Sequence, residues 1–220
     1  MKLHPTLRAA VDDLPRAERF HLLGRARSFP LDALCNEVPP AGRVLEVGCG
    51  HGLVAASLAL ESHDREVVGF DIDPDKVRDA EVIARQVRAD GAHLEVTVGD
   101  GGGQLPAGPW QAIVIVDVIY LLAPERQEEL VAACAEGLAP GGVLVLKEND
   151  QHPRLKYAFA RFEEVVATKV VRITAGSDLH WRAATEWARL MELSGLEATV
   201  RRVDKRYPYP HVLILGRRPA

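Results

Sequence analysis

Glycine recurs at alternate positions in one short stretch, directly after an acidic residue. Gly48, Gly50 and Gly52 follow Glu46 at the end of an apolar run, and a helical pattern comes next. Because glycine has no Cβ, its backbone adopts unusual φ and ψ angles and approaches a ligand closely. The N–H groups at the start of the following helix point into the same crevice. This spacing predicts a turn that binds a nucleotide-like ligand.

The position of the glycines separates two kinds of nucleotide site. A dinucleotide fingerprint requires a glycine at position 53, where this chain has Leu53. The carboxylate of Glu46, two residues before the first glycine, repels phosphate groups but suits a ligand that carries amine and sulfonium charge. The motif therefore favours a cationic ligand over a pyrophosphate.

Three further acidic residues stand where predicted strands end. Asp71 follows Glu46 by 25 positions, near the spacing of the ribose-binding acid in a doubly wound sheet. Asp73 is the competing candidate, although its place before a proline fits a helix N-cap better. Asp100 lies past the next strand, where the alternative interpretation is a turn-forming Asp beside glycine. Asp117 interrupts a buried apolar strand and therefore needs a partner.

The segments around these residues alternate between short β-rich runs and helical patterns. Such alternation is typical of βαβ units and a parallel sheet, in which ligands bind at the carboxyl ends of the strands. The predicted strands are Arg43–Cys49, Glu66–Ile72, His93–Gly99, Gln111–Val118, Gly142–Lys147, Glu197–Asp204 and His211–Arg217, and the predicted helices are Gly52–Ser62, Pro74–Asp90, Glu125–Leu138 and Thr185–Leu196.

Two segments lie outside this alternation. Pro15–Phe29 predicts an amphipathic helix, followed by a short Leu31–Asn36 piece, so residues 1–40 are expected to form a helical cap on a domain that spans residues 41–220. Residues 151–179 are an insertion after the fifth strand. Its apolar residues at spacings of three and four predict an amphipathic helix, which either covers the active site or packs as core.

From Arg43 to Glu148 the chain resembles class I S-adenosylmethionine-dependent methyltransferases, and weaker agreement continues to Arg217. Five motifs carry the resemblance in order: Glu46–Gly52, Asp71–Asp73, Gly99–Gly101, Asp117–Tyr120 and Leu138–Gly142. The resemblance implies an α/β fold with a doubly wound, mostly parallel seven-stranded sheet, a C-terminal antiparallel hairpin and helices on both faces. It also implies S-adenosyl-L-methionine as the cofactor.

Family resemblance also assigns roles to individual residues. It places Asp71 on the ribose, Ile72 against adenine, and Asp100 at the adenine amino group. The expected cofactor-binding residues are Glu46, Gly48, Cys49, Gly50, Gly52, Asp71, Ile72, Gly99, Asp100, Gly101, Asp117 and Val118.

Acceptor chemistry is less specifically encoded. Methyl transfer needs donor and acceptor in position and, for some nucleophiles, removal of a proton. We predict Asp117, Glu148 and His152 as catalytic residues; His152 suits a base near neutral pH, with a bystander histidine as the alternative. Asp117, Glu148 and Asn149 also resemble the magnesium site of catechol-type O-methyltransferases, but one residue differs and no metal is expected. Lys147 and Asp150 are further candidate anchors in this run.

Composition limits the remaining classes of function. The chain of 220 residues has 47% hydrophobic and 26% charged residues and a net charge of -4, which is typical of a globular domain and argues against DNA as a partner. Its three widely spaced cysteines favour reduced thiols. No signal peptide or membrane-spanning run is expected, so we predict a cytoplasmic protein.

Charge is unevenly distributed along the sequence. Residues 61–100 are acidic overall, whereas residues 201–218 and Arg16, Arg19, Arg25 and Arg27 are basic. These clusters are either solvated faces or a rim that attracts an acidic substrate.

The leading hypothesis is an enzyme that moves a methyl group from S-adenosylmethionine to an O, N or C atom of a small-molecule or lipid-like acceptor, with an acidic acceptor as one option. A methyltransferase that acts on RNA or protein is the alternative, and a non-catalytic S-adenosylmethionine-binding protein is another. A homodimer is left open.

Overall fold

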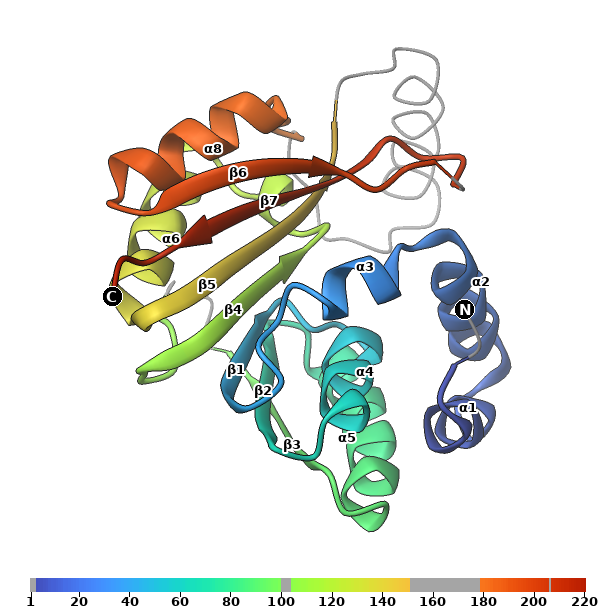
Figure 1. The fold of residues 1–220 in the computed structure, drawn as a ribbon. Helices are drawn as coiled ribbons and strands as arrows, with labels where there is room; N and C mark the ends of the chain where they lie inside the picture. The colour runs from blue at the N-terminus through green and yellow to red at the C-terminus, as the bar shows by residue number, and fades with distance from the viewer. Residues whose placement is uncertain (1–2, 100–103, 151–178, 206) are drawn as a thin grey trace.

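The computed structural model describes residues 3–99, 104–150, 179–205 and 207–220, and a seven-stranded sheet forms its centre (Figure 1). The strand order is β3-β2-β1-β4-β5-β7-β6. Strands β1 to β5 run parallel, and β7 lies antiparallel between β5 and β6. This topology confirms the predicted fold class. The strands are β1 (Gly42–Val47), β2 (Arg65–Asp71), β3 (His93–Val98), β4 (Trp110–Val116), β5 (Leu138–Asn149), β6 (Glu197–Arg202) and β7 (His211–Arg217).

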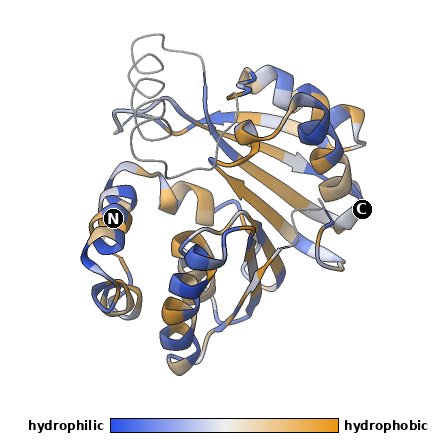
Figure 2. Ribbon diagram, turned by 180° about the vertical axis from the view of Figure 1, so that it is seen from behind, coloured by the Kyte–Doolittle hydropathy of each residue, from blue (hydrophilic) through white to orange (hydrophobic). Residues whose placement is uncertain are grey.

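Successive residues of the central strands face opposite sides of the sheet and enter two separate cores. In β4, Ala112 and Val114 pack into one core, whereas Ile113 and Ile115 pack into the other. All four side chains are fully buried, which explains why this strand has a continuous apolar sequence. Figure 2 shows the central strands coloured as hydrophobic along most of their length.

Helices cover both faces of the sheet. The core beneath Ala112 contains side chains of α1 to α5, and the core beneath Ile113 contains side chains of α6 and α8. The helices are α1 (Pro5–Asp12), α2 (Arg16–Ser28), α3 (Leu31–Cys35), α4 (Leu53–Glu61), α5 (Pro74–Ala89), α6 (Pro124–Gly137) and α8 (Ala184–Leu193), with a 3₁₀ turn η1 (Ile119–Leu121).

The N-terminal helices lie together beside α4 and α5 (Figure 1). Helix α1 was not predicted from the sequence, although Leu7, Ala10 and Val11 are fully buried in it. Helix α2 was predicted, but its apolar face is narrower than expected because Leu22 is its one buried side chain. The remaining face of α2 is therefore available for polar contacts.

A buried arginine fastens this N-terminal segment to the sheet. Arg65, at the start of β2, is 3% exposed and donates hydrogen bonds to the carbonyl oxygens of Cys35, Val38 and Pro39. It also pairs with Glu61 at 3.2 Å. A buried guanidinium requires such a set of acceptors, so the position of α3 relative to the sheet is closely determined.

The fifth strand begins earlier than predicted. We expected a turn over Leu138–Gly142, but β5 begins at Leu138, which pairs with Trp110. Gly141 N donates to Arg218 O, and Arg218 N donates to Gly142 O. Pairing with the strand on either side therefore keeps this Pro-Gly-Gly segment within the sheet, with Gly141 at a φ of 74°.

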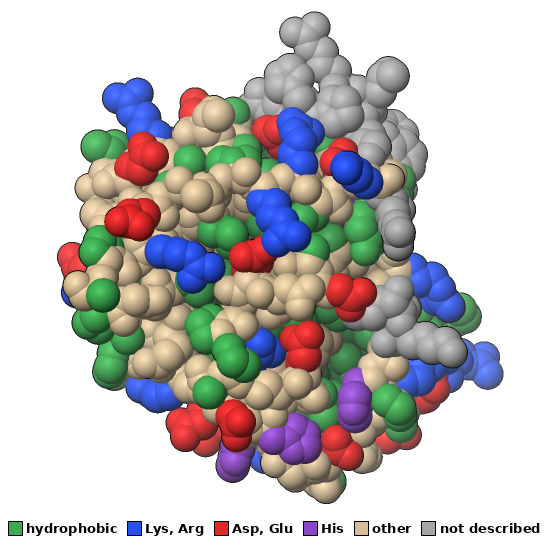
Figure 3. Space-filling view, in the orientation of Figure 1, with side chains coloured by type: hydrophobic (Ala, Val, Ile, Leu, Met, Phe, Trp, Pro, Cys, Tyr) green, Lys and Arg blue, Asp and Glu red, His purple; other side chains and the backbone are tan. Residues whose placement is uncertain are grey.

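Several basic side chains of the predicted clusters are paired with carboxylates. Arg201 contacts Glu37, and Arg202 contacts Asp150. Figure 3 shows acidic and basic side chains interspersed on this face of the molecule. The solvated-face interpretation therefore accounts for these two arginines. Within the described ranges, no helix combines the length and apolar character needed to cross a bilayer.

Candidate active site

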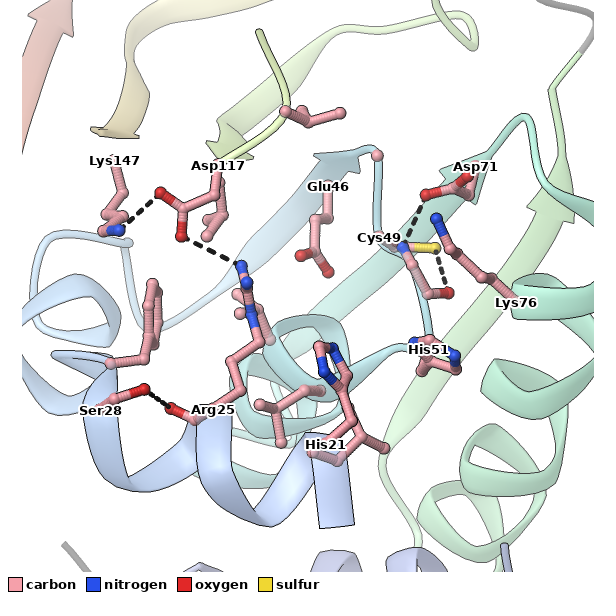
Figure 4. Close-up of a pocket in the computed structure, with 18 of the residues that line it drawn as sticks. His21, Arg25, Ser28, Glu46, Cys49, His51, Asp71, Lys76, Asp117 and Lys147 are labelled. Carbon is pink, nitrogen blue, oxygen red and sulfur yellow. Dashed lines mark hydrogen bonds and ion pairs between the residues drawn. The ribbon is translucent and has the colours of Figure 1, made fainter. Parts of the chain in front are cut away.

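A cavity of about 640 Å³ lies at the carboxyl ends of the parallel strands. Glu46, Asp71 and Lys147 line it from β1, β2 and β5, and Asp117 lines it directly after β4. Helix α2 closes the opposite side, with the Arg25 side chain pointing toward the strand ends (Figure 4). The cavity therefore lies where ligands bind in open α/β sheets.

The three glycines of the turn have positive φ angles of 73°, 53° and 81°. A Cβ on Gly48 would lie 2.9 Å from the Val118 side chain, and a Cβ on Gly52 would lie 3.1 Å from Ala80. Gly50 differs, because a Cβ there would meet nothing within 4 Å and Gly50 lines the cavity. Packing therefore requires Gly48 and Gly52, whereas Gly50 presents open backbone to a ligand.

Asp71 connects the glycine turn to the neighbouring strand and is 8% exposed. Its Oδ2 accepts a hydrogen bond from Gly50 N at 2.8 Å, and its Oδ1 accepts one from Asp73 N at 3.0 Å. Asp73 caps α5 by accepting from the N–H groups of Asp75 and Lys76. The structure thus places Asp71 in the cavity and Asp73 at the helix N-terminus.

Glu46 is almost completely buried, and one of its oxygens lacks a partner. Its side chain is 2% exposed, and Oε2 has no hydrogen-bond partner among the described residues. Burial raises the pKa of Glu46 to about 8, although a backbone hydrogen bond from Ala55 and the charge of Arg25 act in the opposite direction. A buried polar atom without a partner is unfavourable. Glu46 therefore suits a ligand that brings a hydrogen-bond donor or a cation.

Asp117 pairs with two cations at the other end of the cavity. Its Oδ1 accepts from Lys147 Nζ at 2.6 Å, and its Oδ2 accepts from Arg25 at 3.2 Å. Asp117 has a φ of 52°, a left-handed conformation that favours glycine. Burial raises the pKa of Asp117, but the charges of Lys147 and Arg25 outweigh burial and lower it overall. Asp117 is therefore an ionised carboxylate and a weak base.

Lys147 is 1% exposed and reaches the cavity from β5. Its Nζ lies 5.4 Å from the centre of the Phe29 ring, which favours the ammonium through a cation–π contact. Burial lowers the pKa of Lys147, whereas its bond to Asp117 acts against that change. Figure 4 shows Lys147 and Arg25 on either side of Asp117.

His211 fastens the end of α2 to strands β5 and β7. Its Nε2 lies 2.6 Å from the Ser28 carbonyl oxygen, and its Nδ1 lies 3.1 Å from the Asn149 side chain. Burial, helped by the charge of Lys147, lowers the pKa of His211 to about 3, so the ring is neutral. Because the Ser28 carbonyl only accepts, Nε2 carries the hydrogen, and Nδ1 lies against Oδ1 of Asn149.

Two further histidines lie beside the glycine turn. The rings of His21 and His51 are 5.8 Å apart, and His51 Nε2 lies 3.8 Å from an oxygen of Asp79. Burial lowers the pKa of both histidines. Near neutral pH they therefore add uncharged polar groups to the wall between α2 and the turn.

Aromatic side chains form part of the wall near η1. Tyr120 lines the cavity and stacks on Trp181 with a 4.1 Å separation of ring centres and an interplanar angle of 13°. The backbone N–H of His180 donates to the carbonyl of Tyr120. The segment that precedes α8 is thereby fixed against this wall.

Comparisons with known proteins agree with this geometry. Residues 45–144 match a family model described as a methyltransferase domain. Ubiquinone biosynthesis O-methyltransferase from Psychrobacter cryohalolentis is 29% identical over 122 residues, 54% of this chain and 44% of that protein. Ribosomal protein L11 methyltransferase from Bordetella parapertussis is 35% identical over 131 residues, 54% of this chain and 36% of that protein. The chain thus spans about half the length, or less, of these curated relatives.

Solved structures share the whole architecture. Magnesium protoporphyrin IX methyltransferase from Synechocystis, solved with bound SAH, has a TM-score of 0.67 at 17% identity and covers 97% of this chain and 93% of its own. The pyocyanin biosynthetic protein PhzM has a TM-score of 0.73 at 18% identity, covering 96% and 61% respectively. Over residues 45–144 the chain is thus similar in sequence to methyltransferase domains, and it shares the fold of solved S-adenosylmethionine-dependent methyltransferases. Its mostly parallel seven-stranded sheet and C-terminal antiparallel hairpin are those expected from the sequence.

Most of the predicted cofactor-binding residues gather around the cavity. The predicted residues that line it are Glu46, Gly48, Cys49, Gly50, Asp71, Asp117 and Val118. Gly52 instead precedes α4 as its N-cap. Ile72 is 68% exposed, and neither Ile72 nor Gly99 lines the cavity. Asp100 and Gly101 lie outside the described residues, as do His152 and the predicted insertion helix.

Glu148 lies on the other face of the sheet from Asp117. Lys147 lines the cavity, and side chains alternate along β5, so Glu148 points toward the core of α6 and α8. The structure therefore does not bring Asp117, Glu148 and Asn149 together as a magnesium site. In the part of the chain that the structure describes, no cluster of three His, Cys, Asp or Glu side chains is arranged to hold a metal ion.

Sequence reasoning missed the contribution of α2 to the cavity. Arg25 was noted as part of a basic cluster, without a role at the site, and His21 and Phe29 were not predicted to line it. The sequence signal that could have indicated this role was the largely polar composition of the predicted helix Pro15–Phe29. Tyr209 and His211, from the connection into β7 and its first residue, also line the cavity.

Proposed function

We propose that this chain binds S-adenosylmethionine and transfers its methyl group to a small-molecule or lipid-like acceptor. The single observation that supports this most is the cavity at the strand ends, with Glu46 and Asp71 at one end and Asp117 at the other. When bound, the cofactor supplies an electrophilic methyl group on a sulfonium. The protein residues then have to bind, orient and exclude water.

The described side chains fit this cofactor. The unpartnered Oε2 of Glu46 matches an α-amino group, and the open backbone at Gly50 allows close approach. Each carboxylate oxygen of Asp71 accepts one backbone hydrogen bond and retains a lone pair for a ribose hydroxyl. Arg25 provides a cation for the carboxylate of the amino-acid end.

The second half of the site positions the acceptor. Asp117 is held ionised by its two cations, so we assign it an orienting role as a hydrogen-bond acceptor and not that of a strong base. Helix α2 lies over the cavity and limits the entry of water. His152 stays a predicted base, and we assign no role in the cavity to Glu148.

We favour a small-molecule acceptor over a folded macromolecule because residues of α2 and Tyr120 line the cavity beside the strand ends. The similarity to a ribosomal protein L11 methyltransferase favours the alternative of a protein acceptor. The two alternatives predict that the methyl group is found on different products, a small molecule or a protein.

Incubation with methyl-labelled S-adenosylmethionine separates these alternatives. We expect equilibrium dialysis to detect retention of S-adenosylmethionine and S-adenosylhomocysteine, and we expect label in small molecules of an added metabolite extract. Label confined to protein or RNA would contradict a small-molecule acceptor and indicate a macromolecular one. Retention without any turnover would indicate a binding protein, and no retention would contradict the proposal altogether.

A further inference from the structure

The charges of the cavity favour an anion once the cofactor is bound. Of the described side chains that line it, Arg25, Lys76 and Lys147 are basic, and Glu46, Asp71 and Asp117 are acidic. These charges balance in number. The sulfonium of the proposed cofactor then leaves the site with a positive charge. The remaining partner of the site is therefore expected to be an anion.

Two cations meet at one end of the cavity, where Lys147 and Arg25 share one carboxylate. Each of these cations bonds to Asp117, which supplies a single negative charge. The imidazole of His211 also faces this end, and it is neutral. Glu148, the next residue of β5, lies on the opposite face of the sheet, with the strand between it and the cavity. A protonated amine would be repelled here, whereas an oxygen anion would be stabilised.

The surrounding walls indicate the shape of this anion. Phe29 lies against Lys147, and Tyr120 and Tyr209 line the same cavity. Tyr120 is itself held flat against Trp181. Aromatic walls next to a cation suit a planar, partly apolar molecule that ends in a negative oxygen.

We propose that the Lys147 end of the cavity binds the methyl acceptor through an oxygen anion, a phenolate or a carboxylate, so that the chain is an O-methyltransferase. This inference rests on the proposed function and names its class of acceptor. The acceptor O–H loses its proton to solvent on binding. A lone pair of that oxygen then forms the new C–O bond while the S–CH₃ bond breaks, and the bonding pair stays on sulfur. The products are a methyl ether or ester, S-adenosylhomocysteine and the released proton.

Matched pairs of probes test the inference with the wild-type chain. The protein is first saturated with S-adenosylhomocysteine, and its binding is confirmed by calorimetry. Benzoate is then compared with benzamide, and 4-nitrophenol with 4-nitroaniline, to separate carboxylate from phenolate recognition. We expect at least one anion to bind tenfold or more tightly than its neutral partner. Equal affinities, preference for the neutral partners, or binding of none of the four overturns the inference. Failure to bind S-adenosylhomocysteine instead contradicts the proposed function.

The ionisation of bound 4-nitrophenol provides a second readout, because its phenolate is yellow. Where the phenol binds, we expect its apparent pKa in the complex to lie about one unit or more below that in solution. Lys147→Met should abolish this shift, and Lys147→Arg should retain part of it. Lys205→Met, which removes an exposed cation of the β6–β7 connection, is the matched control and should leave the shift unchanged. An unshifted pKa in the wild-type complex overturns the inference for phenols, whatever the variants do.

Discussion

At the glycine-turn end of the cavity, Glu46, Gly50 and Asp71 belong to one continuous βαβ unit. At the cation end, Arg25, Asp117, Lys147 and His211 come from four elements far apart in the sequence. The first end is built mainly from backbone, since positive φ angles and N–H donors define it. The second is built from charged side chains that neutralise one another.

This difference predicts a division of labour. Backbone geometry serves a ligand that is always the same, whereas a set of side chains from separate elements is easily varied for a particular acceptor. Substitutions at the glycine-turn end should therefore change cofactor affinity, and substitutions of Asp117 or Lys147 should change stability and acceptor use. Arg25 belongs to the cation end but is also assigned to the cofactor, so its substitution tests where the two ends meet.

The largest effect is expected for Asp117→Asn. Asparagine tolerates the left-handed backbone at this position, but the substitution leaves Lys147 buried without its counterion. Breaking a buried ion pair in this way destabilises a protein by about 3–5 kcal/mol. Urea denaturation of both proteins measures the free energy of unfolding. Cofactor affinity should change less than acceptor turnover.

A surface carboxylate is the matched control for that measurement. Asp12 pairs with Arg8 at 3.0 Å, and both side chains are more than 40% exposed. Asp12→Asn should therefore change the free energy of unfolding by less than about 1 kcal/mol. Similar losses of unfolding free energy in the two variants would show that the buried Asp117–Lys147 pair stabilises the protein no more than a surface pair does.

Asp71→Ala tests the other end of the cavity. It removes hydrogen bonds to a charged carboxylate, each of which contributes about 1.5–3 kcal/mol. Calorimetry should find S-adenosylhomocysteine bound ten- to a hundredfold more weakly. Asp73→Ala, two residues later, removes the N-cap of α5 and a half-exposed ion pair with Lys76. It should lower stability by about 1 kcal/mol without changing affinity. The reverse pattern would assign the ribose to Asp73.

The same division explains what the sequence allowed us to predict. The glycine turn, the alternation of strands and helices and the place of Asp71 depend on local spacing. The structure confirms the predicted fold class and places Gly50 and Asp71 at one cavity. The roles of Arg25 and His211 depend on contacts between distant segments, which no local pattern reveals. Glu148 shows a further limit: residues adjacent in a strand face opposite sides of the sheet, so a cluster in sequence is not a cluster in space.

A smaller effect is expected at Glu46, on the number of protons released when the cofactor binds. Burial raises the pKa of this residue to about 8, so it is protonated near pH 7 before the cofactor binds. A cationic amino group at Oε2 favours the ionised form, and the proton must leave. Affinity should therefore rise with pH and level off above about pH 8. Calorimetry at pH 7 in buffers of different ionisation enthalpy should detect release of about one proton per cofactor. Glu46→Gln should remove both the release and the pH dependence. Proton release that persists in Glu46→Gln would place the titrating group elsewhere.

The smallest change in stability is expected for Arg25→Met. This variant distinguishes an effect on cofactor affinity from an effect on folding. The side chain of Arg25 is 33% exposed, so water screens its pair with Asp117, and the loss of folding free energy should stay below about 1 kcal/mol. Arg25 nevertheless reaches across the cavity from α2, and we expect cofactor affinity to fall about tenfold because a charged hydrogen bond is lost. Arg27→Met on the same helix controls for helix propensity and net charge, because Arg27 is exposed and its side chain bonds to the Leu23 carbonyl within α2. If both variants bind the cofactor equally well, α2 acts as a cover for the cavity and not as part of the cofactor site.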